Sequence, residues 1–397
     1  MKDLSFRRPV IVAAVTIIVA VAVVIGLTTG GGGGGGARTA ASTPARPARP
    51  STGSFLNAVI PSAAAAAGEA RAVNRALAVM SDARKVATVF LWGLDANHTD
   101  ARAIRALRGR GLGGVALTDA DLSRVPGLAR SLGSSSPGGP LLLAAQVGGI
   151  FNAVQGPPLS APTDVGSAAA AAREATGATR TLRRAGIDGV LAPDLDVGPP
   201  DNPAVGERAF SDSARATAQF GRAVVDAYGT GGMFAAPSHF PGLGSASQPV
   251  EDGPANVASS KRELAKSDLV PFRAAIDAGA PGIVISNGLY VYDDFVTPGS
   301  LSHEVMVDVL RHQLGFRGVA ITGDLTDPGV TALAAPARAA VAALKAGADL
   351  LYVSGPPTDQ QAAYRAVLAA VRTKAVKRTR LDEAVRRVLT VKGEYGR

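Results

Sequence analysis

Short apolar segments alternate with longer helical segments along most of this chain, and this alternation limits the folds open to it. Each apolar segment is hydrophobic throughout, which is typical of a strand in a parallel sheet covered on both faces. Eight strand–helix units within about 310 residues indicate the α/β class and favour a closed (β/α)8 barrel of the TIM type over an open sheet. The expected strands are 86–92, 114–118, 140–145, 189–193, 233–239, 282–286, 318–322 and 348–353.

Helical patterns fill the intervals between these strands. Gly186 is placed to end one helix, and Ser211 or Asp212 and Ser302 are placed to cap two others. A Gly-x-Gly-x-x-Gly turn after the first strand is absent from the sequence, which argues against a dinucleotide-binding fold. The expected helices are 61–83, 101–110, 168–184, 211–228, 261–278, 303–314, 334–346, 359–373 and 381–393.

The N-terminal region has the composition of a membrane anchor. Lys2, Arg7 and Arg8 precede an uncharged apolar run over residues 10–27, which as a helix spans about 27 Å, close to the thickness of a hydrocarbon core. Basic residues before the run predict a cytoplasmic N-terminus. We expect a signal anchor over residues 1–29, which makes the protein a single-pass cell-membrane protein with an extracytoplasmic C-terminal domain. The alternative is a cleaved secretory signal and a secreted protein.

A tether is expected after the anchor. Gly30 to Gly36 are consecutive glycines, and Ala-Arg-Pro repeats follow them. No strand precedes the glycines in the sequence and no Gly-Lys-Ser/Thr ending follows, so a phosphate-binding loop is not expected. We interpret residues 30–54 as a flexible linker and residues 55–397 as the globular domain.

Composition excludes several classes of function. The formal net charge is +9, but the arginines are spread along the expected helices, so no nucleic-acid partner is expected. The chain has no cysteine, which excludes disulfides, thiolate metal sites and cysteine nucleophiles. The histidines His98, His303 and His312 are expected on loops or helices, with His98 far in the sequence from the other two, and no metal site is expected.

Polar residues follow two of the expected strands. Ser238–Gly244, with the sequence Ser-His-Phe-Pro-Gly-Leu-Gly, ends the fifth strand, and Gly323-Asp324-Leu325 follows the seventh. In barrels of this class the chemistry lies at the C-terminal ends of the strands. We therefore expect the functional site at these two strand ends.

Four stretches carry a family resemblance. They are Met80–Val86; Asn202–Phe210, close to Asn-Pro-x-Ile-Gly-x-Arg-Ser-Phe; Ser238–Gly244, close to Lys-His-Phe-Pro-Gly-His-Gly; and Leu314–Leu325, close to Leu-Gly-Phe-x-Gly-x-Val-x-Ser/Thr-Asp-x-Leu. From about Met80 to Lys392 the chain resembles the N-terminal domain of glycoside hydrolase family 3, in particular the single-domain bacterial β-N-acetylglucosaminidase (β-N-acetylhexosaminidase) type. The resemblance implies hydrolysis of β-N-acetylhexosaminides in cell-envelope glycans of the peptidoglycan type, without a cofactor.

The family's catalytic residues are not retained at their positions. The nucleophilic aspartate of the family matches Gly323, and the next residue, Asp324, is a candidate substitute. The acid/base histidine of the family matches Glu251 by counting without gaps, and its sugar-binding lysine matches Ser238. The third-strand Asp-Gln-Glu-Gly-Gly-Arg of the family becomes Ala-Gln-Val-Gly-Gly-Ile over residues 145–150.

Three polar residues match the family and are candidates for substrate binding: Arg208, His239 and Asp196. Each also has a purely structural interpretation. His239 is equally suited to a hydrogen bond within the wall of the site, and Arg208 to an ion pair with Asp196 or Glu207.

These departures leave two functions open. Retaining hydrolysis of a glycoside needs a nucleophilic carboxylate and a general acid about 5 Å apart, and a glycine cannot supply the nucleophile. Asp324 and Glu251 restore the pair only if the loop after the seventh strand directs Asp324 into the site. The first hypothesis is a family 3 hydrolase that is weakly active or inactive, and the second is a non-catalytic glycan-binding or scaffolding protein at the cell envelope.

Overall fold

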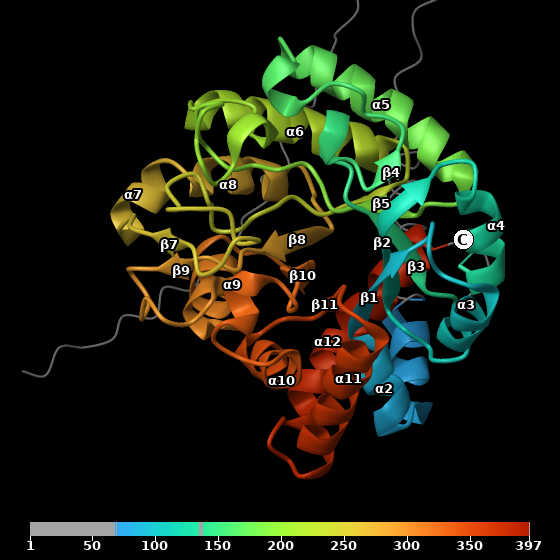
Figure 1. Cartoon of the computed structure of the whole chain (residues 1–397). Coiled ribbons are helices and arrows are strands. Elements are labelled where there is room, and N and C mark those ends of the chain that lie inside the picture. Colours follow the sequence, from blue (N-terminus) through green and yellow to red (C-terminus); the bar gives the residue numbers. More distant parts are fainter. Residues whose placement is uncertain (1–67, 69, 135–137, 397) are drawn as a thin grey trace, which may run out of the picture. The chain divides into compact units, whose positions relative to one another are not determined.

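A curled parallel sheet lies at the centre of the fold (Figure 1). The computed structural model describes residue 68, residues 70–134 and residues 138–396. Six strands pair in the order β11-β1-β2-β3-β5-β6, and β10 pairs with β8. Bridges from Phe240 to Ile285 and from Ile321 to Leu350 connect the two sets, so the arrangement is barrel-like. The bounds are β1 Phe90–Asp95, β2 Gly114–Asp121, β3 Leu141–Ala144, β5 Gly189–Val190, β6 Phe234–Ala235, β8 Gly282–Ile285, β10 Val319–Thr322 and β11 Leu351–Val353.

Helices surround this sheet, and smaller elements lie at its edges (Figure 1). The helices are α2 Asp82–Thr88, α3 Ala101–Arg108, α4 Val125–Leu132, α5 Ala168–Ala185, α6 Ala214–Thr230, α7 Lys261–Lys266, α8 Leu269–Asp277, α9 Pro328–Thr331, α10 Pro336–Ala346, α11 Pro357–Arg372 and α12 Arg378–Tyr395, with a π-helix, η5, at Glu304–Gln313. The short strands are β4 Val154–Gln155, β7 Asn256–Val257 and β9 Leu289–Tyr290, and the 3-10 turns are η1 Gly149–Phe151, η2 Pro162–Asp164, η3 Gly206–Arg208 and η4 Gly299–Leu301.

Helix α5 shows how the sequence specifies these outer helices. Ser167 accepts a hydrogen bond from the amide of Ala170 at the start of the helix, and Gly186 ends it with a φ of 101°, a left-handed conformation that favours glycine. Ala171, Ala175 and Leu182 repeat at helical spacing and are buried. Alanine makes up most of this buried face, and α5 packs mainly against α6.

The strand pattern was predicted well, because each expected strand overlaps one strand of the ring. The first expected strand was placed too early. Ser81 accepts a hydrogen bond from the amide of Arg84 and starts α2, which runs to Thr88, so β1 begins only at Phe90. Apolar residues that pack under a short helix have the same composition as a buried strand.

Two helix predictions also need correction. Helix α6 begins at Ala214, and its cap is Ser213 rather than Ser211 or Asp212. The segment expected as one helix over 261–278 forms α7 and α8, because the chain leaves the helical conformation at Ser267.

An ion cluster lies at the N-terminal ends of β10 and β11. Asp349 is fully buried, and its carboxylate contacts Arg311 at 2.6 Å, Arg380 at 2.5 Å and Arg387 at 2.9 Å. The amide of Ala320 also donates to it, at 3.1 Å. The cluster joins η5 and α12 to the bottom of the sheet.

The anchor over 1–29 and the linker over 30–54 lie outside the described residues. Within the part of the chain that the structure describes, no helix is both long and apolar enough to cross a membrane.

Candidate active site

A cavity of about 310 Å³ opens at the C-terminal ends of the strands. Its wall is formed by residues that follow β3, β5, β6, β8 and β10, together with Tyr352 of β11. The charged and polar residues that line it are Asp194, Arg208, Ser238, His239, Glu251, Asn287, Asp324 and Asp327.

His239 is held in the wall by two aspartates. Its Nδ1 lies 2.8 Å from Asp196 Oδ2 and 4.0 Å from Asp194 Oδ1. Burial opposes a charge on the ring, but Asp194 and Asp196 outweigh it and raise the pKa of His239 to about 9. The ring is therefore an imidazolium at neutral pH.

Asp196 lies behind His239 and positions it. The aspartate is only 1% exposed, and its other oxygen accepts the amide of Leu243 at 2.7 Å. Both oxygens of Asp196 thus have protein partners. The side chain fixes the Pro-Gly turn after β6 and the orientation of the imidazolium.

Arg208 lies between two carboxylates. Its Nε is 3.7 Å from Asp194 Oδ2, and its Nη1 is 3.6 Å from Glu251 Oε1. The Asn-Pro motif places it there: Asn202 accepts the amides of Ala204 and Val205 and donates to the carbonyl of Gly244 at 2.6 Å. The guanidinium is mostly buried, whereas the Glu251 side chain is 51% exposed.

Asp324 is oriented by the turn after β10. Its Oδ1 accepts the amide of Thr326 at 2.9 Å, the hydroxyl of Thr326 at 2.6 Å and the amide of Ser354 at 3.1 Å. Three donors on one oxygen fix the carboxylate in place at the cavity wall.

Asn287 fills the space beside Gly323. A Cβ atom at residue 323 would lie 2.7 Å from Asn287 Nδ2, closer than real Cβ contacts allow. Asn287 Nδ2 donates to the carbonyl of Asp324 at 2.8 Å and to Asp327 Oδ2 at 3.0 Å, and Asn287 Oδ1 accepts from Ser300 at 2.5 Å. The amide is therefore held from three sides and has little freedom to move aside.

Two carboxyl groups of the cavity were not singled out from the sequence, Asp194 and Asp327. Asp194 is 2% exposed, and Ser238 donates to its Oδ1. Asp327 precedes α9 without capping it. Burial, with the charges of Asp324 and Glu251, raises the pKa of Asp327 to about 7. The one sequence signal was their position within a few residues of a strand end.

Comparison with known proteins places this site in a family. The family model described as "Glycosyl hydrolase family 3 N terminal domain" matches residues 103–391. The chain belongs to this family. Two solved structures agree: a β-N-acetylhexosaminidase from Beutenbergia cavernae DSM 12333, with a TM-score of 0.71 and 29% identity over 79% of this chain and 99% of that one, and a family 3 β-N-acetylglucosaminidase from Paenibacillus sp. str. FPU-7, with a TM-score of 0.74 and 27% identity over 80% of this chain and 63% of that one.

Curated relatives of this family 3 chain are bacterial β-hexosaminidases. The protein from Xanthomonas oryzae pv. oryzae (strain KACC10331 / KXO85) is 34% identical over 218 residues, 54% of this chain and 61% of that protein. "Beta-hexosaminidase A" from Pseudoalteromonas piscicida is 29% identical over 193 residues, 45% of this chain and 32% of that protein. The match thus spans less than two thirds of either relative.

The family 3 fold brings together four of the five residues predicted from the sequence. Arg208, His239, Glu251 and Asp324 all line the cavity. The fifth, Asp196, lies behind His239. Arg208 pairs with Asp194 and Glu251, rather than with the expected partners Asp196 or Glu207. Their roles toward a sugar stay predictions.

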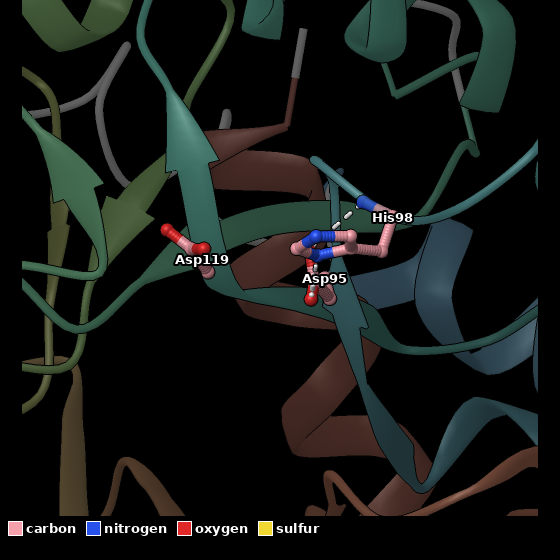
Figure 2. Close-up of side chains that lie close together, drawn as sticks. All are labelled: Asp95, His98 and Asp119. Atoms are coloured by element: carbon pink, nitrogen blue, oxygen red, sulfur yellow. Dashed lines mark hydrogen bonds and ion pairs between the residues drawn. The ribbon is translucent and has the colours of Figure 1, made fainter.

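Two clusters bring potential metal ligands together within the described residues. One is Asp194, Asp196 and His239, whose ring is protonated at neutral pH and so offers no lone pair from Nδ1. The other, outside the cavity, is Asp95, His98 and Asp119 (Figure 2). There Asp95 accepts the amides of Asn97 and His98 and contacts the His98 ring at 2.7 Å. These bonds account for the position of the loop, and we assign no metal to either cluster.

Proposed function

We propose that this chain is a β-N-acetylhexosaminidase-type glycoside hydrolase of family 3 that acts slowly through a rearranged set of carboxyl groups. The observation that carries the proposal is the convergence of Arg208, His239 and four carboxyl groups on one cavity at the strand C-termini. The names of the relatives support the same class of substrate, a β-linked N-acetylhexosamine.

The geometry supports a role for each group. Arg208 and the imidazolium of His239 present positive charge and N–H donors to sugar hydroxyls. Asp324, which three hydrogen bonds hold in place, is the candidate nucleophile instead of the missing side chain at residue 323. A carboxylate in this role attacks the anomeric carbon of the sugar or stabilises its positive charge. Glu251, the candidate acid/base predicted from the sequence, is half exposed and paired with Arg208.

A second candidate function is glycan binding without catalysis. Gly323 and the fixed Asn287 favour it, because together they remove the family's nucleophile and fill its place. The cavity and Arg208 retain a shape and charge that suit a sugar in either case.

Turnover separates the two candidates. We expect the soluble domain to hydrolyse a chromogenic β-N-acetylglucosaminide slowly and a β-glucoside less well, and the Asp324→Asn variant to lose this activity while still binding N-acetylglucosamine in calorimetry. Binding without turnover by the wild-type protein establishes the non-catalytic function instead. If the wild-type protein shows neither binding nor turnover, both candidate functions are rejected.

We also propose that residues 1–29 anchor the protein in the cell membrane, with the domain outside the cytoplasm and facing peptidoglycan-type glycan. The apolar run after Lys2, Arg7 and Arg8 supports this. The full chain should stay in the membrane fraction after alkaline washing. A mature protein that begins beyond residue 29 and appears in the medium indicates a cleaved signal.

A further inference from the structure

Asp327 has the surroundings of a carboxyl group that holds a proton. It lies on the short loop between β10 and α9, three residues after Asp324, and lines the same cavity. Its Oδ2 accepts from Asn287 at 3.0 Å. Its Oδ1 has no hydrogen-bond partner among the described residues and keeps some solvent exposure, and Asp327 is one of the residues that line the cavity.

Burial, together with the neighbouring charges, sets the protonation state of Asp327. Burial and the carboxylates of Asp324 and Glu251 favour the neutral acid, and they outweigh the Asn287 hydrogen bond and the charge of His239, which favour the anion. Asp324 has different surroundings, because its Oδ1 accepts three hydrogen bonds. The two carboxyl groups on this turn therefore have different surroundings, and a difference of this kind separates the acid from the anion in hydrolases with two carboxyl groups.

The other groups of the cavity are less suited to donate a proton. The Glu251 side chain is 51% exposed, and its Oε1 lies 3.6 Å from Arg208 Nη1, so it faces solvent and already has a cationic partner. His239 carries a proton, but its two aspartates raise its pKa to about 9, which makes it a weak acid at neutral pH.

We propose that Asp327 is the general acid of this site and replaces the acid/base residue of the family. The inference rests on the proposed hydrolase function. As the bond between C1 and the glycosidic oxygen breaks, that oxygen takes the proton of Asp327 and leaves as an alcohol, while an electron pair of Asp324 Oδ2 forms a bond to C1. Water then attacks C1, its proton passes to Asp327, and Asp324 is released as the carboxylate.

The test compares leaving groups. Asp327→Asn is expected to lose 10²–10⁴-fold in kcat/KM on N,N′-diacetylchitobiose, whose leaving alcohol needs a proton. It should lose far less on the 2,4-dinitrophenyl glycoside, whose phenolate leaves without one. Wild-type kcat/KM on chitobiose should fall as pH rises through about 7, where Asp327 loses its proton, and this limb should disappear in the variant.

Controls separate the possible failures. Asp252→Asn removes an exposed carboxyl group beside the cavity and should behave as wild type, and Asp327→Glu should recover part of the chitobiose activity. Asp327 does not cap α9, so the asparagine variant should show an unchanged circular dichroism spectrum. Equal losses on both substrates, or no loss, overturn the role of Asp327 alone. Absence of wild-type turnover on both substrates overturns the proposed function with it.

Discussion

A buried aspartate lies near cations at each end of the sheet, but the two aspartates differ in how completely their oxygens are hydrogen-bonded. At the N-terminal end, Asp349 is surrounded by Arg311, Arg380 and Arg387, and its carboxylate is saturated with donors. At the C-terminal end, carboxyl groups outnumber the cations Arg208 and His239, and Asp194 Oδ2 is buried without a hydrogen bond.

This difference in hydrogen bonding distinguishes a cluster that stabilises the fold from a cluster that is suited to react. Where donors satisfy every carboxylate oxygen, the charges hold elements together and no group is left to react. Where carboxyl groups outnumber the cations around a cavity, a carboxyl group keeps its proton to a higher pH than usual. Some carboxyl oxygens also remain free to accept hydrogen bonds from a ligand. The following predictions test this contrast, beginning with the largest expected effect.

Removal of the Asp349 carboxylate should have the largest effect on stability. Asp349→Ala leaves three mostly buried guanidinium groups without their shared anion, and we expect a loss of about 3–5 kcal/mol in the free energy of unfolding. Urea denaturation measures it. Asp382→Ala, which removes a half-exposed partner of Lys85, is the control, with an expected loss below about 1 kcal/mol. Equal losses would remove the distinction between this cluster and surface ion pairs.

The His239 imidazolium should make stability depend on pH. Its pKa is raised to about 9 in the folded state from about 6.5 unfolded. The folded state therefore holds the extra proton, and the stabilisation is complete below pH 6.5 and lost as pH rises through 9. We expect wild type to lose about 2–3 kcal/mol more than His239→Gln over this window. NMR titration of the ring checks the assignment, and parallel pH curves for both proteins contradict it.

A methyl group at residue 323 should be destabilising. Gly323→Ala brings Cβ against Nδ2 of Asn287, a side chain held by two hydrogen bonds from Nδ2 and one to Oδ1. We expect a loss of about 1–3 kcal/mol in the free energy of unfolding. The control is Gly177→Ala in α5, where the structure shows no atom within 4 Å of the new Cβ and helix propensity predicts a gain of up to about 1 kcal/mol. The added variant Asn287→Ala should relieve the strain, and additive effects in this double-mutant cycle would show that the two sites are independent.

The smallest expected effect concerns the rim of the cavity. Glu251→Gln removes a half-exposed partner of Arg208 at 3.6 Å, and we expect less than about 1 kcal/mol in unfolding free energy. A larger loss would mean that the rim, like the Asp349 cluster, is a stabilising network.

The sequence was sufficient for the strand order and for most of the cavity. Uniformly apolar segments locate the strands, and the motifs around His239 and Asp324 place these two residues after strands, where the structure has them. The motif around Arg208 lies on the loop between β5 and α6, in η3. Secondary-structure boundaries were less predictable, as at Thr88 and Phe90, because burial under a helix and in a sheet requires the same residues.

The remaining part of the site depends on distances that no local pattern encodes. Asp194 accepts a hydrogen bond from Ser238, 44 positions away in the sequence, and Asp327 accepts one from Asn287, 40 positions away. Such contacts arise only when the strands are arranged around the ring. Of the three hydrogen bonds that orient Asp324, two come from the nearby Thr326, and the third comes from Ser354, a residue at the end of another strand.

The position of α12 has a consequence for how the chain reaches its native state. Arg380 and Arg387 of this last helix meet Asp349, and Asp382 contacts Lys85, 297 positions earlier. During synthesis these partners emerge long after β1, so the seam between the first and last strand–helix units closes late. Contacts of such high sequence separation slow folding. We therefore expect the N-terminal half to remain an incomplete sheet until the rest of the chain is synthesised, with exposed strand edges that chaperones recognise.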